Sequence, residues 1–178
     1  MKTGVPGGLL FNSYMINYKF CPQCKNDLSL SGEYPYCPSC NLTIYRNSKP
    51  CVTILPIKDG QVLLSKRGIN PYKGDWDTIG GFLEPGEHPE VGALRETLEE
   101  TGLNVKITGL FGVYMDKYGD DGDDVQINAY LAEVISGNVE AKDDVASLEW
   151  VDINKIDTIT SRFKAVVEIL RDLKQHYS

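Results

Sequence analysis

The stretch from Gly81 to Leu103 constrains the fold of this chain more than any other. Pro89 suits the first turn of a helix and Gly102 suits a C-terminal cap, so the stretch predicts a loop followed by a short helix. At about 100° per residue, apolar side chains gather on one face of this helix and glutamates on the other. We expect the apolar face, Val91, Leu94, Leu98 and Thr101, to pack on the domain. The opposite face carries Glu96, Glu99 and Glu100.

The acidic face has no neighbouring lysine, because none lies between Lys73 and Lys106. Like charges three or four residues apart cost about 0.2–0.5 kcal/mol per pair, so an ordinary solvated face would intersperse cations. Gly92 and Ala93 lie near the carboxylates on the helical wheel and leave space beside them. Clustered carboxylate oxygens with such space suit hard divalent cations, Mg²⁺ or Mn²⁺ first. A solvated acidic face is the alternative interpretation.

The same stretch resembles the Nudix box of the Nudix hydrolase family, G-x5-E-x7-R-E-U-x-E-E-x-G-U, where U is apolar. Thr97 occupies the first U position, and the remaining positions match at Gly81, Glu87, Arg95, Glu96, Glu99, Glu100, Gly102 and Leu103. The resemblance implies an α/β fold, the Nudix α/β/α sandwich with a mixed sheet. It also implies Mg²⁺- or Mn²⁺-dependent cleavage of a nucleoside diphosphate linked to another group, with the backbone carbonyl of Gly80 among the metal ligands.

Cleavage of a pyrophosphate requires water to approach a phosphorus atom that anionic oxygens shield, so the site must neutralise those oxygens. Glu96 and Glu100 lie one helical turn apart and can share a cation, while Glu99 can hold a second ion or orient water. The resemblance adds Asp144, which precedes the strand containing Trp150, as a carboxylate near the attacking water. The sequence leaves the general base open among Glu96, Glu99 and Asp144.

Other residues near the box are candidates for supporting or substrate-binding roles. Glu87 and Arg95 are expected to pair and brace the loop against the helix. The guanidinium fork of Arg67 matches phosphoryl oxygens, although a solvated strand end explains it nearly as well. The aromatic residues available to stack on a base, each of which could instead pack in the core, include Trp76, Phe82 and Tyr118.

Two cysteine pairs precede the box, Cys21-Pro-Gln-Cys24 and Cys37-Pro-Ser-Cys40. This spacing is typical of a zinc ribbon in which four thiolates hold Zn²⁺ tetrahedrally. Two disulfides are the alternative, disfavoured without a secretion signal. So short a module cannot bury a sufficient core, so its structural zinc should supply most of its folding free energy. Cys51, which lies in an apolar run, is expected in the core instead.

The remaining chain predicts the domain organisation. We expect a flexible arm at residues 1–19, the zinc ribbon at 20–45 and the Nudix domain at 50–178. Within the last, residues 51–57 and 61–66 predict one hairpin, 105–118 and 124–134 a second, and 146–152 a final strand. An amphipathic helix follows from Ser161, and its apolar face should pack on the sheet or, alternatively, form a dimer contact.

Charge and hydropathy limit the partners of the 178-residue chain. Its net charge of −7 disfavours binding to nucleic acid or to an anionic membrane surface. No apolar run approaches the ~18 residues of a membrane span, and the start of the chain lacks a signal-peptide core. We therefore expect a cytoplasmic protein, monomeric or homodimeric, whose partner is a small nucleotide.

The ribbon, the Tyr45-x4-Pro50 link and the loop from Phe82 to Glu87 are together similar to the NADH pyrophosphatase branch of the family. The S-Q-P-W-P-F signature of that branch is absent, as is its additional N-terminal domain. The resemblance therefore implies ADP-ribose, NADH or a dinucleotide-like substrate without strong preference for NADH. Two other hypotheses are a nucleotide sensor without hydrolytic activity, which usually has a degraded box, and an enzyme of capped RNA that uses the ribbon for RNA.

Overall fold

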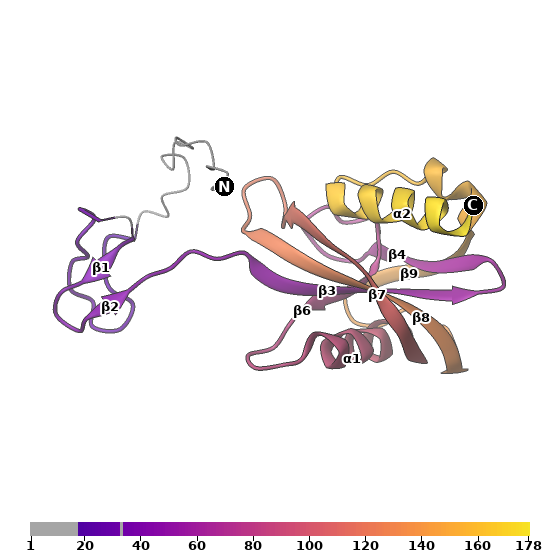
Figure 1. The fold of residues 1–178 in the computed structure, drawn as a ribbon, viewed down its shortest axis with the longest axis horizontal. Helices are drawn as coiled ribbons and strands as arrows, with labels where there is room; N and C mark the ends of the chain where they lie inside the picture. Colours follow the sequence, from indigo (N-terminus) through magenta and orange to yellow (C-terminus); the bar gives the residue numbers. More distant parts are fainter. Residues whose placement is uncertain (1–17, 33) are drawn as a thin grey trace, which may run out of the picture. The chain divides into compact units, whose positions relative to one another are not determined.

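The computed structural model describes residues 18–32 and 34–178, and the chain divides into two compact units, Met1–Arg46 and Asn47–Ser178 (Figure 1). Most of the predicted arm, residues 1–17, lies outside the described residues. In the first unit, the short strands β1 (Tyr36–Cys37) and β2 (Leu42–Thr43) pair antiparallel. Leu28, Cys21 and Cys37 form its small buried core.

The second unit is a three-layer sandwich, which confirms the predicted fold class. Helix α1 (Pro89–Thr101) covers one face of a mixed seven-stranded sheet and α2 (Lys164–Tyr177) covers the other (Figure 1). A 3₁₀ helix, η2 (Ile153–Thr158), precedes α2. The strands are β3 (Lys49–Lys58), β4 (Gln61–Arg67), β5 (Trp76–Asp77), β6 (Ile79–Phe82), β7 (Leu103–Lys117), β8 (Asp124–Gly137) and β9 (Val145–Asp152).

The central strand β3 organises the sheet. It runs parallel to β8 and antiparallel to β4 and β6, and its residues 51–56 are buried, as expected of a strand covered on both faces. The β3–β4 hairpin is confirmed but short, because only Ile57 and Lys58 of β3 pair with β4. Beyond that point β3 pairs with β6, whereas β4 pairs with β5 and β9. The sheet therefore opens between β3 and β4, next to the box.

The predicted packing face of α1 is wrong for its three large apolar residues and right for Thr101, which is buried. Val91, Leu94 and Leu98 are exposed, and the buried residues are Gly92, Ala93, Thr97, Glu100 and Thr101. The reason is that α1 lies close to the loop and sheet beneath it. A Cβ atom on Gly92 would lie 2.4 Å from Cδ2 of Leu83, so the space beside Gly92 that the wheel indicated is already filled. The helix packs through its small side chains, and this places Glu100 against the sheet.

The terminal helix α2 packs as its amphipathic pattern predicted. Its buried residues join the core formed by β3, β4 and β8; they are Ala165, Val166, Ile169, Leu170 and Leu173. The carboxylate of Asp116 accepts a hydrogen bond from the Ala165 backbone N–H at 2.8 Å, which satisfies one free donor of the first turn. Neither helix in the described part of the chain has the length and apolar composition needed to cross a bilayer.

The close packing of α1 makes a prediction about stability. Thr97 is fully buried, and its hydroxyl donates to the Ala93 carbonyl at 2.6 Å, so Thr97→Leu should overpack the contact and lower the free energy of unfolding by about 1–3 kcal/mol. The same substitution at Thr108, an exposed residue of β7, should change it by no more than about 0.5 kcal/mol. Urea unfolding measures both, and equal effects would contradict the packing described here.

Candidate active site and zinc site

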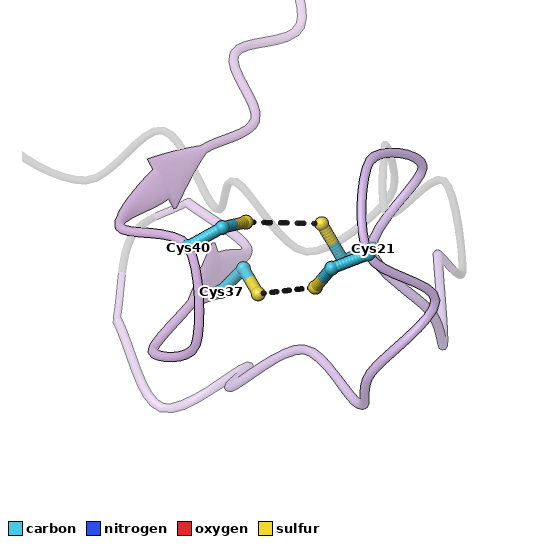
Figure 2. A group of neighbouring side chains, drawn as sticks. Cys21, Cys37 and Cys40 are labelled. Carbon is cyan, nitrogen blue, oxygen red and sulfur yellow. Dashed lines mark hydrogen bonds between the residues drawn. The ribbon is translucent and has the colours of Figure 1, made fainter.

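The four cysteines of the first unit converge on one point (Figure 2). The Sγ atoms of Cys21 and Cys40 lie 3.5 Å apart, those of Cys24 and Cys37 lie 3.4 Å apart, and all four lie within 4.8 Å of one another. Zn–S bonds of about 2.3 Å in a tetrahedron place sulfurs ~3.8 Å apart, so the thiols suit zinc without rearrangement. No disulfide forms among the cysteines, all of which are described.

The backbone around the cysteines matches a zinc ribbon. Lys25 and Asn41, each directly after a cysteine pair, have φ angles of 64° and 58°, the left-handed conformation that turns the chain there. The Lys25 N–H donates to the Cys21 carbonyl at 2.9 Å and closes the first turn. Cys51, by contrast, is buried in β3 as predicted, and burial raises its pKa to about 12.

Arg95 connects the box loop to the box helix. Its Nε and Nη2 atoms donate to the two carboxylate oxygens of Glu87, both at 2.9 Å, and Nη2 also reaches the Phe82 carbonyl at 3.2 Å. The bonds from Arg95, followed by one from the Glu84 backbone N–H, lower the pKa of Glu87 to about 2. The predicted pair is therefore present as a bidentate brace.

The same guanidinium restrains two of the glutamates on α1. Nη1 of Arg95 lies 2.8 Å from Oε1 of Glu96 and 2.9 Å from Oε2 of Glu99. The Glu96 carboxylate lies close to the sheet, because a Cβ atom on Gly81 would come within 2.6 Å of it. A side chain at position 81 would displace the Glu96 carboxylate from this position. Burial raises the pKa of Glu96 despite the bond from Arg95.

Glu100 has the most unusual environment in the box. Its side chain is buried, and Oε2 accepts a hydrogen bond from the Gly80 backbone N–H at 2.9 Å. Burial raises the pKa of Glu100 to about 9, and the negative charges of Asp144, Glu96 and Asp77 contribute to the shift. A carboxyl group that is desolvated beside other carboxylates is poorly stabilised as an anion unless a cation joins it.

We call Glu96, Glu99, Glu100 and Asp144 the acidic cluster. Although Asp144 lies far from α1 in sequence, its charge raises the pKa of both Glu96 and Glu100. The loop holds it there, because the Gly68 backbone N–H donates to the Asp144 carbonyl at 2.6 Å. The predicted carboxylates are thus near enough to influence one another electrostatically: Glu99 and Asp144 act on Glu96, and Glu96 and Asp144 act on Glu100.

Arg67 does not face an open site. Its three donor groups already bond to protein acceptors: Nε to the Pro71 carbonyl at 2.7 Å, Nη1 to Asp77 at 2.7 Å and Nη2 to the Tyr118 hydroxyl at 3.1 Å. The sequence analysis missed Asp77, although a lone carboxylate in a short apolar strand beside the box is a usable signal. The nearly buried Arg67–Asp77 pair joins the hydrogen-bonded strands β4 and β5.

A small cavity of about 80 Å³ lies beside this pair, on the side of the sheet that α2 covers. Arg67, Asp77, Tyr118 and Phe163 line it together with the backbone of Gly80 and Gly81. The Phe82 ring packs edge-on against Tyr118 with ring centroids 5.1 Å apart. Three predicted substrate contacts are thus neighbours. Of the four predicted contacts, Arg67 and Tyr118 line the cavity, whereas Phe82 and Trp76 do not. Trp76 packs under Lys66, whose Nζ lies 4.6 Å from the ring centroid.

Comparison with known proteins decides the family. The sequence profile of the NUDIX domain matches residues 47–173, most of the chain. The chain belongs to the Nudix hydrolase family. It is 36% identical over 111 residues to an ADP-ribose pyrophosphatase from Methanocaldococcus jannaschii, a match that covers 62% of this chain and 66% of that protein. It is 28% identical over 144 residues to the NAD-capped RNA hydrolase NudC of Vibrio parahaemolyticus, covering 79% of this chain and 54% of NudC.

A solved structure extends the similarity. A NUDIX hydrolase from Nitrosomonas europaea superimposes with a TM-score of 0.74 at 27% identity, covering 90% of this chain and 93% of that one. This chain spans between half and two thirds of the length of the curated relatives named above.

The acidic cluster of this Nudix chain has the donor chemistry for Mg²⁺ or Mn²⁺. Arg95 engages one oxygen of Glu96 and one of Glu99 and leaves the second oxygen of each available. Those oxygens, the Glu100 carboxylate and the backbone of Gly80 are the hard ligands that these cations prefer. One arginine beside four carboxylates also leaves excess negative charge for a divalent ion to offset. The residues present therefore fit the metal that the resemblance implies.

The thiol geometry predicts the metal content of the first unit. Protein purified without chelator should carry about one zinc per chain, because four converging thiols make a closed structural site. Elemental analysis measures this, and Cys40→Ser should lower the content sharply. Cys51→Ser, which alters the other cysteine in the chain, should leave it unchanged. Zinc-free protein with disulfides mapped to Cys21, Cys24, Cys37 and Cys40 would contradict the assignment.

Proposed function

We propose that this chain is a metal-dependent pyrophosphohydrolase that cleaves a nucleoside diphosphate linked to another group. One observation carries the proposal: the buried Glu100 carboxyl, next to Glu96 and Asp144, with its pKa raised to about 9. A glutamate with only a structural role in a solvated helix face would not be desolvated beside other carboxylates. A divalent cation accounts for both the burial and the accumulated charge.

Each residue of the cluster has a separable role. Glu100 and Glu96 hold the cation, and Glu99 holds a second ion or orients water. The bound metal would neutralise phosphate oxygens and lower the pKa of the attacking water. Arg95 keeps Glu96 and Glu99 in place and braces the loop through Glu87. The general base is one of Glu96, Glu99 and Asp144, which lie together in the cluster.

The neighbouring rings of Phe82 and Tyr118 are the proposed contacts for the remainder of the substrate. Stacking of these rings on a base or sugar would orient the pyrophosphate toward the cluster. A phosphate contact by Arg67 would require the side chain to give up one of its three bonds to protein acceptors. We infer that Arg67 chiefly fixes the wall of the cavity.

The role of Glu100 predicts the effect of one isosteric change. Glu100→Gln keeps the size and nearly the helix propensity of the side chain but removes an anionic ligand. Turnover should fall by at least about 100-fold, since each 1.4 kcal/mol of lost transition-state stabilisation is tenfold in rate. Added Mn²⁺ should recover part of the loss. Steady-state rates on the best substrate measure this.

Glu84→Gln is the matched control, because Glu84 lies in the box loop but outside the acidic cluster. Its effect on turnover should be much smaller. Circular dichroism must show that both variants are folded. Wild-type turnover in folded Glu100→Gln protein would refute the metal role and with it the proposed mechanism.

The substrate is predicted at the level of a class. ADP-ribose, NADH, NAD⁺, dinucleoside polyphosphates and nucleoside triphosphates, each supplied with Mg²⁺, form the test panel, with products resolved by chromatography. We expect cleavage of ADP-ribose or a dinucleotide-like substrate, and no strong preference for NADH. A preference for NADH of about 100-fold, equivalent to ~2.7 kcal/mol, would contradict this expectation.

Similarity to NudC makes capped RNA a second candidate. The seven net negative charges of the chain disfavour it. A salt titration of RNA binding separates the two possibilities, because several phosphate contacts would give a steep dependence on salt concentration.

A further inference from the structure

Asp144 is the one member of the acidic cluster that lies outside α1. It belongs to the loop between β8 and β9 and follows Asp143, whose φ angle of 52° is in the left-handed region. No donor in the described part of the chain bonds to its half-buried carboxylate. Burial is the main cause of the raised pKa values of three nearby carboxyl groups, and the charge of Asp144 adds to each: Glu96, Glu100 and Asp77. The backbone of the loop must therefore place this carboxylate at the cluster.

One side of the loop is tied to the last turn of α1. The Glu140 backbone N–H donates to the Thr101 carbonyl at 3.0 Å. The Lys142 backbone N–H donates to the Glu100 carbonyl at 3.1 Å, and the Val145 N–H donates to the Lys142 carbonyl at 3.1 Å, which closes the turn before β9. The residue whose side chain is buried in the cluster thus also holds the loop through its main chain.

The other side of the loop rests on Gly68, which directly follows β4. The Gly68 N–H donates to the Asp144 carbonyl at 2.6 Å. A Cβ atom on Gly68 would lie 2.6 Å from that same oxygen and 3.4 Å from the Ala146 nitrogen. The φ angle of Gly68 is not positive, so the local conformation does not require glycine. The close approach of the Asp144 main chain requires it.

Strand β9 is irregular at the same point. Its pairing with β4 shifts register between Lys66 and Arg67, which leaves Ala146 as the extra residue of a β-bulge. Bulges bend the strand that contains them and commonly re-aim side chains next to active sites. The bulge and the contact at Gly68 together determine where the chain places Asp144.

We propose that Gly68 is a positioning residue for Asp144, an inference that rests on the proposed function. The absence of a side chain at position 68 lets the Asp144 main chain lie against the end of β4, and this contact holds the carboxylate at the acidic cluster. A methyl group at position 68 would push the loop away from β4 and move the carboxylate with it. Displacement of a group beside the attacking water should slow the chemical step more than it weakens substrate binding.

A double-mutant cycle in the full-length, zinc-loaded protein tests the proposal. Gly68→Ala should lower kcat by at least about tenfold with KM nearly unchanged, because a small misplacement of a reacting group is costly. On an Asp144→Asn background the same substitution should change kcat by less than about twofold, because the group that Gly68 positions is already lost. Gly109→Ala is the control in β7, where the new Cβ atom meets nothing within 4 Å, and it should leave kcat unchanged.

Two outcomes of the cycle would overturn the proposal. An equal loss of kcat on both backgrounds would show that Gly68 supports the fold in general and does not act through Asp144. Wild-type kcat in folded Gly68→Ala protein would show that the contact does not position the carboxylate. The proposed function fails on a different result, wild-type turnover in Glu100→Gln protein, which leaves the ratio of the two Gly68→Ala effects unaltered.

A measurement on the wild-type protein keeps the proposal falsifiable if Gly68→Ala does not fold. The hydrogen bond between Gly68 and Asp144 should give an NMR scalar coupling between the donor nitrogen and the carbonyl carbon. The bond from the Arg67 N–H to the Asp75 carbonyl, at 3.0 Å, is the internal reference. Detection of the reference coupling without the Gly68–Asp144 coupling would show that the positioning contact is not made, and would overturn the assignment.

Discussion

The short distance between α1 and the sheet is the constraint on which the rest of this structure depends. Apart from Glu100, the residues that α1 buries are all small: Gly92, Ala93, Thr97 and Thr101. The helix can therefore approach the sheet closely. This packing buries Glu100, whose carboxylate accepts a hydrogen bond from the Gly80 backbone N–H. Gly80 is needed within the sheet, since a Cβ atom there would lie 2.1 Å from the Val52 backbone oxygen in β3, and a Cβ atom on Gly81 would displace the Glu96 carboxylate. The contact that packs α1 on the sheet therefore also positions Glu100 for the proposed metal.

Because of this packing, the sides of α1 differ in their surroundings. One side carries Glu96 and Glu99 toward Arg95 and the acidic cluster. The other side carries Val91, Leu94 and Leu98 into solvent, although their spacing suggests a core. The helix is therefore amphipathic in an unusual sense, because polar and small residues face the sheet while large apolar residues face outward.

Much of the site could be predicted from sequence because its signals are local. The cysteine spacing placed the four thiols, and the box placed the glutamates, the Arg95 brace, the Pro89 start and the Gly102 cap. The packing face of α1 could not be predicted, because hydrophobic periodicity assumes that the largest apolar side chains go inward. Here a close approach to the sheet excluded them. The Arg67–Asp77 pair was missed because it joins strands β4 and β5 through a contact that only the folded sheet creates.

The buried Glu100 also links metal binding to protons. Its pKa is raised from 4.5 to about 9 by burial, so without metal the native state keeps a proton that the unfolded chain releases. The contribution of Glu100 to stability is thus fully present below pH 4.5 and is lost as the pH rises through about 9. A cation requires the ionised carboxylate and must displace that proton.

Calorimetric titration of Mn²⁺ into the protein near pH 7.5, in two buffers of different ionisation enthalpy, tests this account most directly. The wild-type protein should bind the ion and release close to one proton, whereas folded Glu100→Gln protein should bind at least about tenfold more weakly and release almost none. Equal affinity and equal proton release in the two proteins would show that Glu100 is not a ligand and would contradict the account.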